Sequence, residues 1–333
     1  IQMKYLITLS ILFTLNSIFA QGIYHKAKIY YSSNKDLLLL ANQGVAIDHV
    51  THKKGVFIES DFSQNEINIA KGLGLNVEIV IENVSEFYSK QNNQKSLEKN
   101  ASCNDAISYA VPNNYNSGSM GGFLTYSEML QELDDMANLY PNLITVKQSI
   151  SNFSTEEGRP IYWVRMSDNP NTNENEPEML YSAIHHAREP GSLQQTIFYM
   201  WYLLENYSSN DEVQAILNNT ELYFVPCINP DGYIYNETTN PNGGGLWRKN
   251  RRDNLDGEYG VDLNRNYDYQ WGGAGTSANT NSDVYRGPNA FSEVETQAMK
   301  WLCEQHDFKI ALNSHTYSNL LLYPFGYATG QIS

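Results

Sequence analysis

Cysteine is scarce in this chain, with three residues among 333, at positions 103, 227 and 303. Because three is odd, at least one cysteine has no partner within the chain, and no Cys-x-x-Cys pair points to a cysteine-ligated zinc site. Cys227 lies in the apolar run 222–228 and Cys303 in a helix-like segment, so we expect both in the core. A disulfide bond between these two is an open alternative in an oxidising compartment.

Basic residues are also few, with 22 Lys and Arg against 37 Asp and Glu, for a formal net charge of −15. This balance argues against nucleic acid and anionic membrane surfaces as partners. Long apolar runs are missing as well. After residue 20, no stretch reaches the roughly 18 to 20 apolar residues that a membrane-spanning helix requires. We therefore expect no membrane span.

Residues 1–20 have the pattern of an export signal. Lys4 is the only charge before an apolar run from Leu6 to Phe19, and Ala20 is a small residue suited to a cleavage site. A run this short with such flanks is typical of a signal peptide. We expect a protein that is secreted or periplasmic after its removal. Ile1 and Gln2 precede Met3, so the ends of the chain are expected to be arbitrary.

The region after the signal alternates between strand and helix patterns. Within residues 24–90, the predicted elements are a strand at 27–31, a helix at 35–42, a hairpin at 47–61, a helix ending at 72–74 and a strand at 76–81. Ser63 and Glu66 form a capping box for the second helix, and Asn34 is the expected cap of the first. The order β-α-β-β-α-β predicts a small ferredoxin-like α+β domain. His49 and His52 are expected on its surface.

Residues 91–122 differ in composition from their neighbours. They are rich in Asn, Ser, Lys and Gly and contain few large apolar side chains. Such a stretch buries too little apolar surface to fold alone. The composition therefore predicts a linker that is accessible to proteases.

Residues 123–333 form the largest predicted domain. Its predicted strands cover 143–150, 161–166, 178–184, 222–228 and 308–312, and its predicted helices cover 126–139, 192–207, 211–217 and 292–305. Capping boxes open the first helix at Thr125 and Glu128 and the last at Ser292 and Glu295. Strands that alternate with helices predict an α/β fold with a mixed, largely parallel sheet flanked by helices.

Ligands of open α/β sheets bind beyond the carboxyl ends of the strands. His186 and Glu189 follow the strand 178–184, and His315 follows the strand 308–312. Pro190 suits the first position of the next helix, which places Glu189 at the helix mouth. A catalytic zinc site has three protein ligands and an open position. We take His186, Glu189 and His315 as these ligands. His185 is the competing register, but its side chain should point to the other side of the strand.

Four ordered stretches resemble the zinc carboxypeptidases of the A/B type, from about Gly121 onward. They are His186-Ala-Arg-Glu189, Trp247-Arg-Lys249, Val261-Asp-Leu-Asn-Arg-Asn266, and Ser314-His-Thr-Tyr317 followed by Leu320-Leu-Leu-Tyr-Pro-Phe-Gly326. The resemblance implies one Zn²⁺ per chain, held by His186, Glu189 and His315. It also implies hydrolysis of the C-terminal peptide bond of peptides or proteins by zinc-activated water.

The same resemblance implies roles for residues around the metal. Arg248 would polarise the scissile carbonyl and stabilise the oxyanion, and Asp262 would orient His186. Asn264 and Arg265 would hold the terminal carboxylate of the substrate. The next subsite would be lined by Arg188, Thr316 and Tyr317. The N-terminal unit resembles the family's activation domain, which would dock over the active site until an activating protease cleaves the linker 91–122.

One part of the family's apparatus is missing from the sequence. The family needs a general-base glutamate and a closing tyrosine well downstream of the third zinc ligand, but no acidic residue follows His315 before the chain ends at Ser333. We expect a fragment without the C-terminal part of the catalytic domain and without activity of its own. The alternatives are a non-catalytic zinc module that binds peptide C-terminal carboxylates, or a zinc hydrolase of small acylated amino acids.

Overall fold

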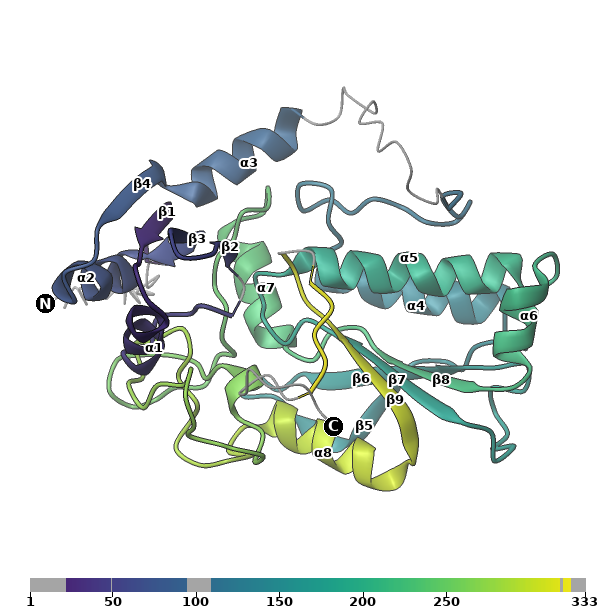
Figure 1. Cartoon of the computed structure of the whole chain (residues 1–333). Coiled ribbons are helices and arrows are strands. Elements are labelled where there is room, and N and C mark those ends of the chain that lie inside the picture. Colours follow the sequence, from purple (N-terminus) through teal and green to yellow (C-terminus); the bar gives the residue numbers. More distant parts are fainter. Residues whose placement is uncertain (1–21, 49, 95–108, 318–319, 325–333) are drawn as a thin grey trace, which may run out of the picture.

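The computed structural model describes residues 22–48, 50–94, 109–317 and 320–324, which form two sheets with their helices (Figure 1). Within these residues, no helix combines the length and the apolar character needed to cross a membrane. The predicted export signal and His49 lie outside the described residues. The first sheet comes from the chain before residue 95 and the second from the chain after residue 109.

The N-terminal sheet has the strand order β2-β3-β1-β4, with antiparallel pairing throughout. Its strands are β1 (Tyr24–Tyr30), β2 (Thr51–Lys53), β3 (Phe57–Ser63) and β4 (Val77–Ile81), and its helices are α1 (Asn34–Asn42), α2 (Gln64–Gly72) and α3 (Val84–Gln94). The predicted order of elements is observed up to β4. The assignment to the ferredoxin-like class stays a prediction. The core of this unit is Ala27, Ile29, Tyr31, Leu40, Val45, Ile58, Phe62, Ile67 and Ala70.

The two helix starts of this unit differ in how well they were predicted. The capping box at α2 is confirmed, because Ser63 is the N-cap and its N–H donates to Glu66. The cap of α1 is Ser33, and Asn34 is already helical, because Asp36 accepts the Ser33 N–H. His52 is exposed, as expected.

The second sheet has the strand order β5-β6-β8-β7-β9. Its strands are β5 (Gln148–Ser154), β6 (Pro160–Met166), β7 (Glu178–Ala183), β8 (Glu221–Val225) and β9 (Phe308–Ser314). The pairs β5–β6 and β6–β8 are antiparallel, whereas β7 pairs in parallel with β8 and β9. The predicted mixed sheet is confirmed, although parallel pairing is less dominant than expected.

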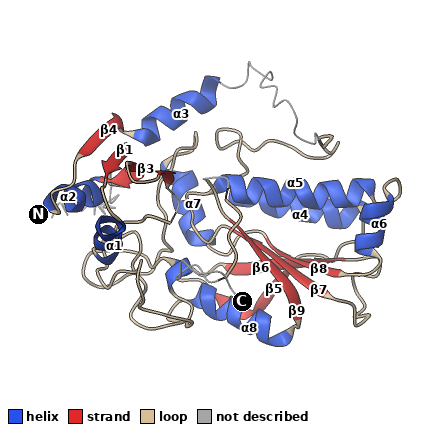
Figure 2. Ribbon diagram, viewed as in Figure 1, coloured by secondary structure: helices blue, strands red, loops and turns tan. Residues whose placement is uncertain are grey.

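Helices cover both faces of this sheet, as Figure 2 shows. They are α4 (Tyr126–Leu139), α5 (Pro190–Asn206), α6 (Asp211–Leu217), α7 (Pro230–Thr239) and α8 (Val294–Gln305). Helices α4 and α5 bury Met129, Leu133 and Trp201 against one face. Helix α8 buries Met299 and Leu302 against the other. The predicted arrangement of helices on a central sheet is therefore confirmed.

Several predicted boundaries in this part are wrong. The strand expected from residue 143 begins only at Gln148, because Ile144 makes a single bridge to Met166. Helix α8 begins at Val294, since the Ser292 hydroxyl donates to the neighbouring Glu293 carboxylate and caps no helix. Helix α7 was missed because its Pro230 and Gly232 resemble a turn in the sequence.

The predicted linker 91–122 is too long. Residues 91–94 still belong to α3. On the other side, the N–H groups of Asn113 and Asn114 donate to Glu205 on α5 at 2.6 and 2.7 Å. Met120 is buried in the core of the second unit. The polar composition of the predicted linker hid the contacts to Glu205, because backbone N–H groups of asparagines make them.

The cysteine prediction is half right. Cys227 is buried as expected, but Cys303 is exposed on α8. Both are free thiols, so the alternative of a bond between them is not realised.

Candidate metal centre

The candidate metal centre begins where β7 ends. Ile184 follows this strand with φ +53° and is fully buried, a conformation that a β-branched residue adopts only under strain. Such strain costs on the order of 1–3 kcal/mol and gathers at functional sites. The bend leads directly to His186. Pro190 is then the first residue of α5 and Glu189 its N-cap, as predicted.

Three side chains converge at this point. His186 Nδ1 lies 2.7 Å from Glu189 Oε1, and His315 Nδ1 lies 2.8 Å from Glu189 Oε2. The two imidazole nitrogens are 3.1 Å apart. Parallel pairing of Ala183 with Ser314 brings the ends of β7 and β9 together, so that His315 reaches the pair that is adjacent in sequence. The structure thus brings together the three predicted ligands, whose donor atoms all lie within 4.8 Å of one another.

The environment favours the protonation states that bind a cation. Burial lowers the pKa of His186, with the charge of Arg248 adding to the effect, so the imidazole stays neutral. Burial opposes the ionisation of Glu189. The imidazoles of His186 and His315 outweigh it and hold the pKa of this carboxyl well below its usual value. Two imidazoles and one carboxylate form the donor set of many catalytic zinc sites, so these residues fit one zinc ion.

Asp262 stands behind the three donors. Its Oδ1 lies 3.2 Å from His186 Nε2, on the side of the ring away from the metal donors. Its Oδ2 accepts from Arg248 Nε and Nη2 at 3.1 and 2.9 Å. Burial opposes ionisation, but Arg248 and then His186 hold the pKa of Asp262 far below its usual value. This single carboxylate therefore fixes both a metal donor and the nearest arginine.

Asn264 and Arg265, the predicted ligands of the substrate carboxylate, follow Asp262 on a 3₁₀ turn, Leu263–Arg265. The N–H of Asn264 donates to Asp262 Oδ1 at 2.9 Å. Arg265 Nη2 lies 2.6 Å from Oδ2 of Asp48, and Arg248 Nη2 lies 3.2 Å from the same oxygen. Asp48 belongs to the N-terminal unit, and its sequence context carried no signal for this contact. A carboxylate is therefore already seated between the two arginines.

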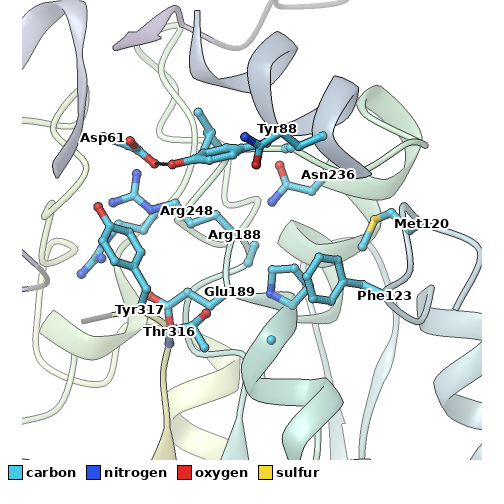
Figure 3. A pocket seen from close by; sticks show the side chains of 18 of the residues that line it. Asp61, Tyr88, Met120, Phe123, Arg188, Glu189, Asn236, Arg248, Thr316 and Tyr317 are labelled. Atoms are coloured by element: carbon cyan, nitrogen blue, oxygen red, sulfur yellow. Dashed lines mark hydrogen bonds between the residues drawn. The ribbon is translucent and has the colours of Figure 1, made fainter. Parts of the chain in front are cut away.

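A cavity of about 430 Å³ opens beside the metal donors (Figure 3). Five predicted residues line it, namely Arg188, Glu189, Arg248, Thr316 and Tyr317. The N-terminal unit closes it with Ser60, Asp61, Tyr88 and Gln91. Sequence reasoning missed other parts of the wall, which include Met120, Phe123, Asn236 and the segment 243–246. The glycines of that segment follow no strand end, so no pattern marked them.

Arg188 points into this cavity and is held from behind. Its Nη1 lies 3.1 Å from Asp283 Oδ2, and its guanidinium lies 5.6 Å from the centre of the Tyr24 ring. The Tyr24 hydroxyl donates to the same carboxylate at 2.8 Å. Asp283 thus contacts both a predicted substrate residue and the N-terminal unit.

His185 does not join the metal donors. Its Nδ1 lies 2.9 Å from Asn313 Oδ1, and its Nε2 lies 2.7 Å from the Tyr267 hydroxyl. Burial, followed by electrostatic repulsion from the neighbouring rings of His315 and His186 when they carry a proton, lowers its pKa to about 3. These contacts fit the structural role that we predict for this residue.

A family model described as zinc carboxypeptidase matches residues 129–331. Metallocarboxypeptidase A of Trichophyton tonsurans is 32% identical over 61% of this chain and 48% of its own length. Carboxypeptidase A2 of Mus musculus is 32% identical over 63% of this chain and 48% of its own. The chain thus spans about half the length of the curated relatives that it matches.

Two solved structures share the fold over most of the chain. The carboxypeptidase A of Helicoverpa armigera has a TM-score of 0.68 and 24% identity, covering 91% of this chain and 72% of its own. Thrombin activatable fibrinolysis inhibitor has a TM-score of 0.66 and 20% identity, covering 94% of this chain and 76% of its own.

Proposed function

Because this chain belongs to the zinc carboxypeptidase family, we propose that it is part of a secreted carboxypeptidase precursor. The reaction would be hydrolysis of the C-terminal peptide bond of peptides or proteins. The observation that carries this proposal is the carboxylate of Asp48, seated between Arg248 and Arg265 beside the metal donors. A substrate's terminal carboxylate would occupy the same place.

His186, Glu189 and His315 would hold one zinc ion through the atoms that converge in the structure. Bound there, zinc would polarise the scissile carbonyl and lower the pKa of a bound water toward about 7. Asp262 would accept a hydrogen bond from the Nε2–H group of His186 and so leave Nδ1 without a proton and free to coordinate. The tautomer and the ring orientation of this ligand would thus be set by a carboxylate that is itself fully buried.

Arg248 would act as the electrophile that stabilises the oxyanion. Its guanidinium is buried and held by two hydrogen bonds to Asp262, so its position needs no reorganisation when charge develops. Asn264 and Arg265 would bind the terminal carboxylate, since a planar guanidinium recognises a carboxylate through paired hydrogen bonds. Arg188, Thr316 and Tyr317 would contact the residue on the other side of the scissile bond.

The N-terminal unit would be the activation domain, residues 24–90. Its residues Ser60, Asp61 and Tyr88 line the cavity beside the metal donors, and Asp48 contacts the two arginines that the substrate needs. Two further contacts dock it: the Ser282 hydroxyl donates to the Gly44 carbonyl at 2.9 Å, and Ser60 Oγ lies 2.9 Å from the Tyr317 hydroxyl. Cleavage by an activating protease within the predicted linker, whose residues 95–108 are not described, would release it.

The proton-transferring groups stay a prediction. Among the described residues that line the cavity, the carboxylates are Asp61 and Glu189. Glu189 faces the metal, and Asp61 belongs to the N-terminal sheet. We therefore assign neither of these two carboxylates as the general base. The alternative of a non-catalytic module for free C-terminal carboxylates uses the same arginines.

Replacing Asp48 by asparagine is expected to open the carboxylate site. Charge-assisted hydrogen bonds contribute about 1.5–3 kcal/mol each, so losing the internal competitor should tighten binding of an external carboxylate by about tenfold or more. The measurement is calorimetric titration of the zinc-loaded chain with N-acetyl-L-phenylalanine. The amide of the same compound, which lacks the carboxylate, should bind Asp48→Asn no more tightly than wild type.

The matched control is Asp61→Asn, which alters a carboxylate of the cavity that contacts Tyr88 and not the arginines. It should leave the affinity for the probe unchanged. Equal affinities of the wild-type chain and Asp48→Asn would contradict both the carboxylate site and the inhibitory role of Asp48.

A further inference from the structure

The capping box of α2 has a second contact that a helix cap does not require. Glu66 is 2% exposed, and its Oε2 accepts the N–H of Ser63 at 2.8 Å and the Ser63 hydroxyl at 2.9 Å. These two bonds complete the cap. The other oxygen, Oε1, accepts the N–H of Ala46 at 2.8 Å, twenty residues earlier in the chain.

Ala46 belongs to the segment 43–48, which runs from the end of α1 to Asp48. Val45 anchors the start of this segment, because its side chain is buried in the N-terminal core and its N–H donates to the Leu40 carbonyl at 3.1 Å. On its other side, the carbonyl of Gly44 accepts from Ser282 of the second unit. Among the described residues, the bond from Ala46 to Glu66 is therefore the last backbone hydrogen bond to the N-terminal unit before Asp48.

We propose that Glu66 is the positioning residue of Asp48, and that it holds the segment 43–48 in the place where Asp48 blocks Arg248 and Arg265. This inference concerns the regulation of the proposed carboxypeptidase site and rests on that proposal. Among the described residues, Glu66 has no hydrogen bond to the substrate residues or to the metal donors. It acts through the backbone of Ala46, and one side chain thereby couples the start of α2 to the inhibitory contact.

The chemistry of the side chain separates its two roles. A glutamine at position 66 still closes a capping box, because Ser-x-x-Gln serves as well as Ser-x-x-Glu. Its single carbonyl oxygen can then face Ser63, while its amide group faces Ala46. Since an amide NH₂ and a backbone N–H are both donors, the bond to Ala46 is lost. Glu66→Gln is therefore expected to keep α2 and to loosen Asp48.

The ionisation state of the Glu66 carboxyl determines the pH at which the experiment is done. Burial, followed by the charge of Asp283, raises the pKa of Glu66 to about 7. Two further ionisable groups face it, Tyr24 from β1 and Arg188 from the second unit. At pH 8 the carboxylate is mostly ionised and accepts through both oxygens, so the difference between Glu66 and a glutamine is then largest.

The experiment is the calorimetric titration with N-acetyl-L-phenylalanine at pH 8 on the zinc-loaded chain. Glu66→Gln should bind the probe about three- to tenfold more tightly than wild type, and less tightly than Asp48→Asn. The matched control is Glu128→Gln, which alters the capping-box glutamate of α4. That glutamate also bonds a loop, through the N–H of Ser119 at 3.1 Å, but a loop remote from Asp48. Its affinity should equal that of wild type.

The double variant Asp48→Asn/Glu66→Gln distinguishes positioning from general destabilisation. If Glu66 acts through Asp48, replacing Glu66 adds no further affinity for the probe once the Asp48 charge is gone. An independent, additive gain would overturn the inference. If Asp48→Asn bound the probe more tightly than wild type and Glu66→Gln did not, this inference alone would be overturned. No gain for Asp48→Asn would instead overturn the proposed function, and this inference with it.

Discussion

Replacing His186 by alanine is expected to abolish stoichiometric zinc binding, from one ion per chain to a residual amount. A catalytic zinc site has three protein ligands, and His186 supplies the nitrogen that lies 2.7 Å from Glu189 and 3.1 Å from His315. Two donors on a partly open site hold zinc weakly. The measurement is metal analysis after dialysis against buffer with micromolar free zinc, with the melting temperature as a check of folding.

Two control variants test whether the loss of zinc is specific to a metal ligand. Asp262→Asn should weaken zinc binding by only about 10–100-fold, as is typical for a residue that orients a ligand. His185→Gln should keep full stoichiometry, because both ring nitrogens of His185 already contact Asn313 and Tyr267. Unchanged zinc content in His186→Ala, or its loss in His185→Gln alone, would show that the ligand set is wrong.

The second large effect concerns stability and its pH dependence. Glu295 on α8 is 1% exposed, and burial raises its pKa to about 8. Its Oε2 accepts from Asn250 at 3.2 Å, while Oε1 has no hydrogen-bond partner among the residues that the structure describes. An acid with a raised pKa in the folded state stabilises the fold while protonated. The stabilisation is complete below the unfolded pKa of about 4.3 and is lost as the pH rises to about 8.

Glu295→Gln should remove this loss, because the amide stays neutral at every pH. The expected gain in the free energy of unfolding above pH 8 is on the order of 5 kcal/mol, since each unit of pKa shift corresponds to about 1.4 kcal/mol. Near pH 4.5 the variant and wild type should be equally stable. Denaturant unfolding followed by tryptophan fluorescence reports this unit selectively, because all five tryptophans lie after residue 122.

Glu156→Gln is the control for the glutamate-to-glutamine change, since Glu156 is exposed. It should leave both the stability and its slope with pH unchanged. If Glu295→Gln unfolded with the same pH dependence as wild type, the carboxyl group would have to be ionised in the folded protein at neutral pH.

Features with local causes were the ones that the sequence could predict. The capping boxes at Ser63 and Thr125 were found because each is closed by residues three apart. Pro190 at the start of α5 follows from its missing N–H. The box at Ser292 failed because tertiary contacts compete: its hydroxyl also accepts from Asn266, which comes from the turn after Asp262.

The sequence by itself determined the donors of the metal centre. His186 and Glu189 share one turn, and His315 follows another strand of the same sheet, so their meeting follows from strand topology. Only the tertiary structure decided what approaches that centre. Asp48 reaches Arg265 across 217 positions, and Asp283 joins Arg188 to Tyr24. Such contacts depend on how two folded units dock, and no periodicity within either unit encodes the surface of the other.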